Sequence, residues 1–582
     1  MRYGASSPAA LVEAAAADGQ GILGLTDRDG LYGAVRFVRA ATAAGIDPVL
    51  GVDLALDEGA ARALHHPGAP HRLDANGNGN GGGDGGGLGA LGVGMPAGAA
   101  RTRGPRTPVR GGALVDDRAP RVVVLARGAG AGVAPGRGWA ALCRLVTAAH
   151  LSSAERGKPL VTPGMLADAV GEEVRVGGAA PSPLLVLLGP DSDVGRTILD
   201  RPDRARELLL RWRELLGESL VVEVTCHDAP PGHVRSAAQS RRLVQLARDV
   251  GVPCVLTAAV RHATPDGAAT VDVLDAARRL TVLDDRHLDR VSTAGHLAAT
   301  TTMTTIARRL TRDDREARML LDVTAAIAAE CVQHPRRDVG LGSIHLPEPD
   351  VLGLVPGEDP HRVLVERCRA GIARCYPHAG EAELARVTER LDDELGVVAS
   401  LGYATYFLTV ALVCDLVRGA GVRVAARGSG AGSLVNHLLG ISGIDPMRHG
   451  LLMERFLTPL RAQLPDIDID VESARRTEMY ELILDHFGGE RVTCVSMTET
   501  YRVRHAIRDV GSALGLPAVE IDAIAKAFPH IRARDARTAI ADLPELSGMG
   551  LTAPRMEVLF ELVERLDGLP RHLALHPRML SV

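Results

Sequence analysis

The stretch Pro465-Asp466-Ile467-Asp468-Ile469-Asp470-Val471 decides how the second half of this chain is interpreted. From Asp466 to Val471 acidic residues alternate with β-branched apolar residues, and this period of two predicts a β-strand with one packed face. The three aspartates would share the other face, with neighbours about 6.5–7 Å apart. Because like charges on one face repel each other, such a row favours a site that holds cations. The structural alternatives are an edge strand protected from aggregation by its charges and a bound structural calcium ion.

A glycine-rich stretch, Arg427-Gly428-Ser429-Gly430-Ala431-Gly432-Ser433, precedes the aspartates. Its small side chains let backbone N–H groups approach an anion, and it leads into 434–439, where a helix start would add unpaired amides and a favourable dipole. No Gly-Lys-Ser/Thr follows, so this is not a Walker A loop, and alone it fits a plain glycine turn equally well. A phosphate cradle beside metal-binding carboxylates indicates phosphoryl or nucleotidyl transfer.

Arginines are frequent in the same interval. Most such arginines form a solvated basic face. Here a phosphate-rich ligand would accept bidentate hydrogen bonds from their guanidinium groups. Arg455 and Arg461 are the first candidates for that role. The interval contains Arg423, Arg427, Arg448, Arg455 and Arg461.

Length and composition limit the possible classes of protein. A chain of 582 residues is too long for one core and predicts two to four domains. The net charge of −5 gives no global basic signal, so a nucleic-acid partner has to be sought in local patches. The eight cysteines form no CxxC pair, which argues against a zinc ribbon or a disulfide framework. No apolar run approaches the length of a membrane span, and we expect a cytoplasmic protein without a membrane partner.

Residues 1–270 read as strands that alternate with helices, which predicts an α/β domain with a largely parallel sheet, and a barrel is one form of it. The interval from about 66 to 119 is rich in Gly, Pro, Asn and Arg and is predicted to be a disordered insertion. The expected strands are Gly21–Leu25, Pro48–Leu54, Arg121–Leu125, Leu184–Leu188, Leu220–Val224 and Pro253–Leu256. The expected helices are Pro8–Ala17, Gly33–Ala43, Arg204–Leu216 and Arg235–Val250.

Polar residues that follow some of these strands could assemble a metal phosphoesterase centre. Their spacing is irregular, and arginines stand where ligands would be wanted, so ordinary loop residues are the favoured interpretation. The candidates are Asp27-Arg28-Asp29, His65-His66, Cys226-His227 and Arg261-His262.

The later half is predicted to be mixed α+β and then helical, because several segments have the apolar spacing of amphipathic helices. These segments are Glu381–Ala399, Tyr406–Gly419, Thr477–Phe487, Glu499–Leu514 and Pro554–Leu566.

The motifs of this half, in their order, resemble those of a known family. Ala426–Val435, Glu454-Arg455-Phe456-Leu457 and Pro465–Asp470 are similar to the palm of bacterial family C DNA polymerases, the DNA polymerase III alpha subunits. Tyr403–Leu408 and Ala506–Gly511 extend the resemblance on both sides. Other segments resemble the error-prone, damage-associated branch of the family: 27–33, 188–193 and 568–573.

The resemblance implies an N-terminal polymerase-and-histidinol-phosphatase-type (PHP) domain with a (β/α) barrel fold, a palm with a nucleotidyltransferase fold and a helical thumb. We expect the PHP-type domain at 1–270, the first palm segment with a helical connection at 271–497, the thumb at 498–567 and a second palm segment from 568 to 582. Asp466 and Asp468 correspond to catalytic ligands of a two-Mg²⁺ site, and Asp470 is a further candidate ligand. Gly428 and Ser429 correspond to the segment that holds the incoming triphosphate, with Arg455 and Arg461 near it.

The implied partners are primer–template DNA, deoxynucleoside triphosphates, a sliding clamp and other polymerase accessory proteins. Two departures from the family pattern are visible. The N-terminal domain of the family usually opens with a His-x-His metal motif, and this chain starts just after the place where that motif would lie. Arg28 and Arg261 also replace expected histidines, which puts a PHP-domain metal in doubt. The chain also ends before the expected third catalytic aspartate, so we expect an N-terminal fragment without activity of its own. The rival hypotheses are a metallophosphoesterase carried by the N-terminal domain and a non-catalytic DNA-binding module.

Overall fold

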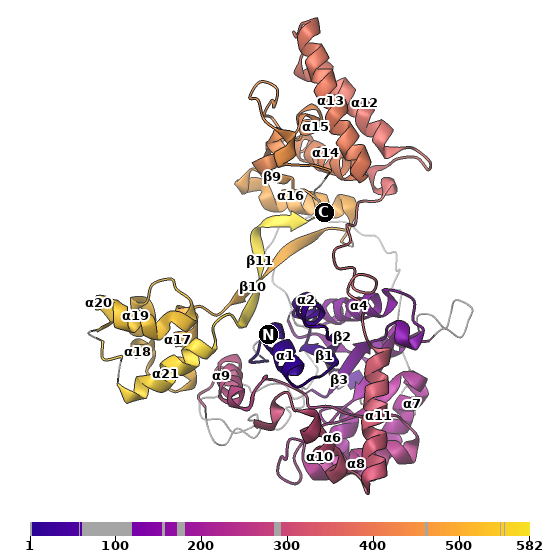
Figure 1. The fold of residues 1–582 in the computed structure, drawn as a ribbon, viewed down its shortest axis with the longest axis vertical. Helices are drawn as coiled ribbons and strands as arrows, with labels where there is room; N and C mark the ends of the chain where they lie inside the picture. Colours follow the sequence, from indigo (N-terminus) through magenta and orange to yellow (C-terminus); the bar gives the residue numbers. More distant parts are fainter. Residues whose placement is uncertain are drawn as a thin grey trace, which may run out of the picture. The chain divides into compact units, whose positions relative to one another are not determined.

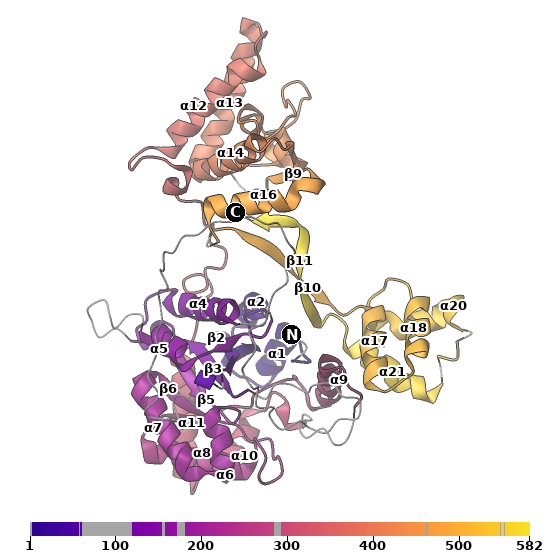
Figure 2. The same cartoon turned by 180° about the vertical axis from the view of Figure 1, so that it is seen from behind.

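The computed structural model describes residues 3–57, 59–60, 119–153, 157–171, 181–283, 293–459, 464–489, 491–547, 549–551 and 553–581. The chain divides into two compact units (Figures 1 and 2). The first unit comprises Met1–Leu341 and Thr498–His572, and the second comprises Gly342–Met497 and Leu573–Val582. His65-His66 and the insertion expected at about 66–119 lie outside the described residues, apart from Ala119.

A seven-stranded sheet forms the centre of the first unit. Its strand order is β1-β2-β3-β5-β6-β7, with β4 paired to β2. Strand β3 runs antiparallel to both neighbours, whereas the other pairings are parallel. The sheet is therefore mixed, and its described strand pairings form one path from β1 to β7. The strands are β1 (Ile22–Arg28), β2 (Asp47–Leu56), β3 (Arg121–Ala126), β4 (Leu160–Val161), β5 (Leu184–Leu188), β6 (Leu220–Val224) and β7 (Cys254–Leu256).

All six strands expected from the sequence are present. The Val- and Leu-rich runs of β5 and β6 are buried on both faces. Strand β4 was missed, since two residues are too short to show a period. Helices contact several of the strands, among them α2 on β2, α4 on β3 and α8 on β6. The helices up to this point are α1 (Pro8–Ala17), α2 (Ala34–Ala44), α4 (Arg137–Ser152), α5 (Pro163–Gly171), α6 (Asp193–Asp200), α7 (Pro202–Leu216) and α8 (Ala237–Val250).

The first unit continues beyond residue 270. Helices α10 (Thr300–Leu310) and α11 (Asp314–Glu330) contribute Leu310 and Leu320 to the core that also contains the sheet residues Val186 and Val222. Helix α9 (Ala268–Arg279) differs, because its Val273, Leu274 and Ala276 share a core with helices from residues 503–565.

That second core is formed by short helices around Tyr501, Phe528 and Phe560, which are fully buried. The start of the helix expected at Glu499–Leu514 is wrong. The helix begins at Val503, and Glu499 and Thr500 belong to strand β10 (Thr493–Thr500). Strand β10 pairs with β11 (Pro570–Ser581). The helices are α17 (Val503–Ala513), α18 (Ala518–Ala527), α19 (Ala536–Asp542), α20 (Pro544–Ser547) and α21 (Pro554–Arg565).

The second unit packs helices around a two-stranded sheet of β8 (Val424–Arg427) and β9 (Asp468–Val471). No single described helix is long and apolar enough to cross a membrane; the bent pair α13 and α14 meets the length and composition criteria together. The apolar residues of that pair, such as Leu391 and Phe407, lie in the core of the unit. The helices are α12 (Pro360–Cys375), α13 (Glu381–Leu401), α14 (Ala404–Gly419), α15 (Leu434–Leu438) and α16 (Arg476–Phe487).

Candidate active site

The aspartate run forms the antiparallel partner of the strand that leads into the glycine-rich stretch. Arg427 lies opposite Asp468, and Ala425 lies opposite Asp470. Asp468 and Asp470 therefore share one face, while Ile469 and Val471 on the other face pack into apolar clusters. The predicted alternation is confirmed for the four residues of β9. The strand begins at Asp468, however, so Asp466 lies before it.

Asp466 is exposed, and its backbone neighbours are fixed by Tyr406 of α14. The Tyr406 hydroxyl donates to the Pro465 carbonyl at 2.6 Å and accepts the Ile467 N–H at 3.1 Å. Burial is the main cause that raises the pKa of Tyr406 to about 12, and the negative charges of Asp466 and Asp468 add to it. The phenol thus stays protonated at neutral pH and holds the chain where it enters β9. Sequence reasoning did not assign it this role.

Arg427 is the cation that faces the strand aspartates. Its Nη2 lies 3.7 Å from Asp468 Oδ2, and its Nε lies 3.2 Å from Asp470 Oδ1. The three side chains are 64%, 46% and 65% exposed. Ion pairs this exposed contribute at most about 1 kcal/mol, so Arg427 is a counterion that another cation could replace.

The glycine loop, residues Gly428–Gly432, is a 3-10 turn directly beside Asp468. A Cβ added at Gly428 would lie 4.0 Å from Asp468 Oδ2, and the φ of +73° at Gly428 favours glycine. At Gly432 a Cβ would meet the Leu452 carbonyl oxygen at 2.8 Å, which requires the absence of a side chain. The loop therefore holds its backbone close to the aspartates, as a cradle for a phosphate chain would.

The start of α15 differs from expectation, because its first amides already have an acceptor. The carboxylate of Glu394, on α13, accepts the Leu434 N–H at 3.1 Å, the Val435 N–H at 3.2 Å and the Ser433 hydroxyl at 3.0 Å. Its side chain is 1% exposed and lies 2.7 Å from Arg390 Nε. The prediction that these amides are open to a phosphate is wrong: an internal carboxylate occupies the helix N-terminus.

The remaining arginines are distributed unevenly. Arg455 is exposed in the turn Met453–Arg455, which contacts the glycine loop. Arg423 pairs with Glu472 at 2.8 Å instead of facing the strand aspartates, and Arg448 is exposed beside Asp445, which accepts its N–H. Arg461 lies outside the described residues. Among the described candidates, Arg427 and Arg455 are thus the ones placed at the loop or the aspartates.

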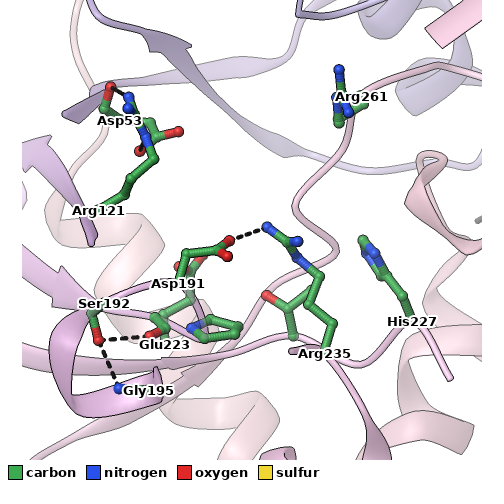
Figure 3. Close-up of polar contacts among 12 residues, drawn as sticks. Asp53, Arg121, Asp191, Ser192, Gly195, Glu223, His227, Arg235 and Arg261 are labelled. Carbon is green, nitrogen blue, oxygen red and sulfur yellow. Dashed lines mark hydrogen bonds and ion pairs between the residues drawn. The ribbon is translucent and has the colours of Figure 1, made fainter. Parts of the chain in front are cut away.

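A second polar cluster lies at the strand ends of the first unit (Figure 3). Arg121 Nε is 2.8 Å from Asp53 Oδ1, and its Nη2 is 2.6 Å from Asp29 Oδ1. Arg235 forms an ion pair with Asp191. We refer to Arg121, Arg235 and Arg261, with their acidic partners, as the arginine cluster.

The histidine and cysteine candidates of this unit have local partners. The ring Nε2 of His227 lies 2.8 Å from the Ala258 carbonyl, and Cys226 contacts Arg309 and Asp228. Asp27 accepts the Gly33 N–H, an ordinary loop role. Among the described residues, no group of three or more His, Cys, Asp or Glu side chains is arranged to hold a metal ion. The phosphoesterase hypothesis therefore has no assembled ligand set in this part of the chain.

Two family models match the chain. The PHP domain matches residues 1–227, and the bacterial DNA polymerase III alpha NTPase domain matches residues 362–579, which include the glycine loop and the aspartates. The chain therefore combines a PHP domain with an NTPase domain of the bacterial DNA polymerase III alpha type. The mixed sheet and its helices are the PHP domain, and the polymerase III alpha domain follows it.

Relatives are similar to this chain along nearly its whole length. An error-prone DNA polymerase of Nocardia farcinica is 32% identical, over 98% of this chain and 45% of the relative. Error-prone DNA polymerases of Symbiobacterium thermophilum and Mycobacterium bovis are 31% and 30% identical, again over 98% of this chain and over 45% and 44% of the relative. The chain thus spans a little under half the length of these curated relatives.

Proposed function

We propose that this chain carries the nucleotidyl-transfer site of a DNA-directed DNA polymerase. The observation that supports it best is the strand pair β8–β9, which sets Asp468 and Asp470 on one face directly beside the glycine loop. Carboxylates next to a backbone cradle suit a reaction in which a triphosphate and a divalent metal have to be held together. In this proposal residues 271–497 supply the first palm segment with a helical connection, which includes α10 and α11 on the PHP sheet core. Residues 498–567 supply the thumb, and 568–582 the start of a second palm segment.

Asp466 and Asp468 would hold Mg²⁺, with Asp470 as a further ligand. The fit rests on donor chemistry, because carboxylate oxygens suit Mg²⁺, and on the exposed Arg427 pairs, which another cation can displace. When bound, the metal ions would lower the pKa of the primer 3′-hydroxyl and neutralise the charge on the leaving pyrophosphate. Tyr406 holds the chain on both sides of Asp466, so this carboxylate can stay near the site although it lies outside the strand.

The glycine loop would bind the triphosphate of the incoming nucleotide through Gly428 and Ser429. Arg427, once released from the aspartates, and Arg455 supply guanidinium groups for the phosphate oxygens, with Arg461 as a third candidate. Glu394 has a positioning role in this scheme, because it fixes Ser433 and Leu434 where the loop ends. Catalysis then comes mainly from positioning and from charge neutralisation.

The names of the relatives favour error-prone synthesis, of the kind used to tolerate or repair damaged DNA. Primer–template DNA and deoxynucleoside triphosphates are the substrates that this function requires. A sliding clamp, other accessory proteins and a cytoplasmic location are further parts of the proposal.

Asp468→Asn tests the function most directly, in a version of the protein that extends this chain to the length of its relatives. It keeps the size of the side chain and removes the charge, so primer extension with Mg²⁺ should fall at least about a thousandfold. Glu472→Gln is the matched control. It neutralises a partly exposed acid that directly follows the same strand and pairs with Arg423, and it should extend primers at the wild-type rate. Asp466→Asn should behave like Asp468→Asn, and Asp470→Asn shows whether the third aspartate is a ligand.

Two outcomes would contradict the proposal. One is primer extension by Asp468→Asn at the wild-type rate. The other is salt-dependent DNA binding without incorporation by the extended version with the wild-type sequence, even at high Mg²⁺, which would identify a non-catalytic DNA-binding module.

A further inference from the structure

The carboxylates at the strand ends of the PHP domain already have partners. Arg121 bridges Asp29 and Asp53, and Arg235 pairs with Asp191. Glu223 accepts the Thr257 hydroxyl at 2.7 Å. A divalent cation needs several carboxylate or imidazole ligands without competing cations, and here guanidinium groups hold three of the four carboxylates.

The guanidinium groups are permanent cations. Burial alone would lower the pKa of Arg121, but the charges of Asp53 and Asp29 outweigh it and raise the pKa above its usual value. The same balance, with Asp191 as the main counter-charge, raises the pKa of Arg235. A metal ion would have to enter a cluster whose positive charge cannot be released as a proton.

Arg261 extends the cluster toward the helical core. Its Nη1 and Nη2 fork onto the Asp275 carboxylate at 2.9 and 2.8 Å, and both side chains are at most 10% exposed. The same guanidinium donates to the Tyr3 carbonyl and lies 3.8 Å from the centre of the Tyr3 ring. Asp275 is on α9, whose neighbouring Val273, Leu274 and Ala276 are in the core shared with α17 and α21.

We infer that the PHP domain of this chain takes no metal ion at its strand ends, and that Arg121, Arg235 and Arg261 act as fixed cations there, the last of them fastening α9 to the domain. The site is closed by internal ion pairs, so it is structural and lacks hydrolytic chemistry. Its stability comes from buried charge pairs, which are costly to break when one partner is removed.

Metal content and thermal unfolding of the protein test the inference. The measurements use Asp468→Asn, so that the palm aspartates do not bind metal, after removal of metal with a chelator. With added Mn²⁺ or Zn²⁺, gel-filtered protein should contain less than one equivalent of metal. The thermal transition of the first unit should have the same Tm with metal as with chelator, because a ligand that does not bind the folded state does not change its stability.

Arg121→Ala, in the same background, should lower the Tm of the first unit by about 6–12 °C. It leaves Asp53 partly buried without its cation and removes the closer of two cations from Asp29, which Arg28 faces at 3.9 Å. Arg423→Ala is the control, because it removes an equally long side chain from an exposed ion pair with Glu472 and should leave the Tm unchanged. If Arg121→Ala does not fold, Arg261→Lys supplies the second variant: it keeps the charge, loses the fork onto Asp275 and should give a smaller drop.

The inference is overturned if the chelator lowers the Tm, or if one equivalent of metal binds and is lost in Asp53→Asn. The inference is also overturned if Arg121→Ala has the same Tm as the Asp468→Asn protein with Arg121 in place. None of these results depends on polymerase activity, so the inference and the proposed function can fail separately.

Discussion

The two units of the molecule each join arginine to aspartate, with opposite consequences. In the PHP domain, Arg121 and Asp53 are 12% and 18% exposed and 2.8 Å apart. In the second unit, Arg427 and Asp468 are 64% and 46% exposed and 3.7 Å apart. Because a low dielectric strengthens the attraction and excludes competing water, the first pair is fixed, whereas the second can be exchanged for a metal ion. Burial, and not residue type, separates a structural pair from a candidate catalytic site.

The largest effect on stability is expected at Glu394, which is the buried carboxylate of the second unit. Glu394→Ala removes the carboxylate that accepts from Arg390 Nε and from the donors of Ser433, Leu434 and Val435. It should lower the free energy of unfolding of this unit by about 3–5 kcal/mol. Denaturant titration measures it. Glu389→Ala, an exposed position on the same helix, is the control and should change stability by less than about 0.5 kcal/mol. Equal stabilities of the two variants would remove the contrast between buried and exposed acids.

A smaller effect is expected from pH in the PHP domain. Burial is the main cause that lowers the pKa of His227 to about 4. The unfolded chain binds the proton with a pKa near 6.5, so the contribution of neutral His227 to the free energy of unfolding is fully present above that pH. It falls by up to about 3 kcal/mol as the pH drops toward 4. Tm measured between pH 7 and 4 should therefore fall more steeply for the wild-type protein than for His227→Gln. Parallel curves would show that His227 is solvated.

The smallest effect is expected at the exposed pair. Arg427→Ala should change stability by less than about 1 kcal/mol. It should also tighten Mn²⁺ binding up to about fivefold, because it removes a competing cation from Asp468 and Asp470. Titration of Mn²⁺ followed by electron paramagnetic resonance measures this affinity, with Arg423→Ala as the control. Weaker Mn²⁺ binding in Arg427→Ala would mean that Arg427 helps to form the site instead of competing for it.

The sequence predicted the features that depend on local pattern. The strands of the PHP sheet and the alternation in Asp468–Val471 follow from apolar runs and from a period of two, and the structure contains them. The partners of charged residues could not be predicted in this way, because Arg121 and Asp53 are 68 positions apart and Glu394 and Leu434 are 40 apart. The available signal for Glu394 was a glutamate on the apolar face of an amphipathic helix, between Leu391 and Val398. Asp466 was expected in the strand, and the structure places it before the strand.

Diffraction from crystals of the protein soaked in Mn²⁺, recorded at the manganese absorption edge, tests the contrast between the two units most directly. An anomalous peak beside Asp468, and none among Asp53, Asp191 and Glu223, is the predicted result. A peak among those three PHP-domain carboxylates without one at Asp468 would contradict both halves of the account.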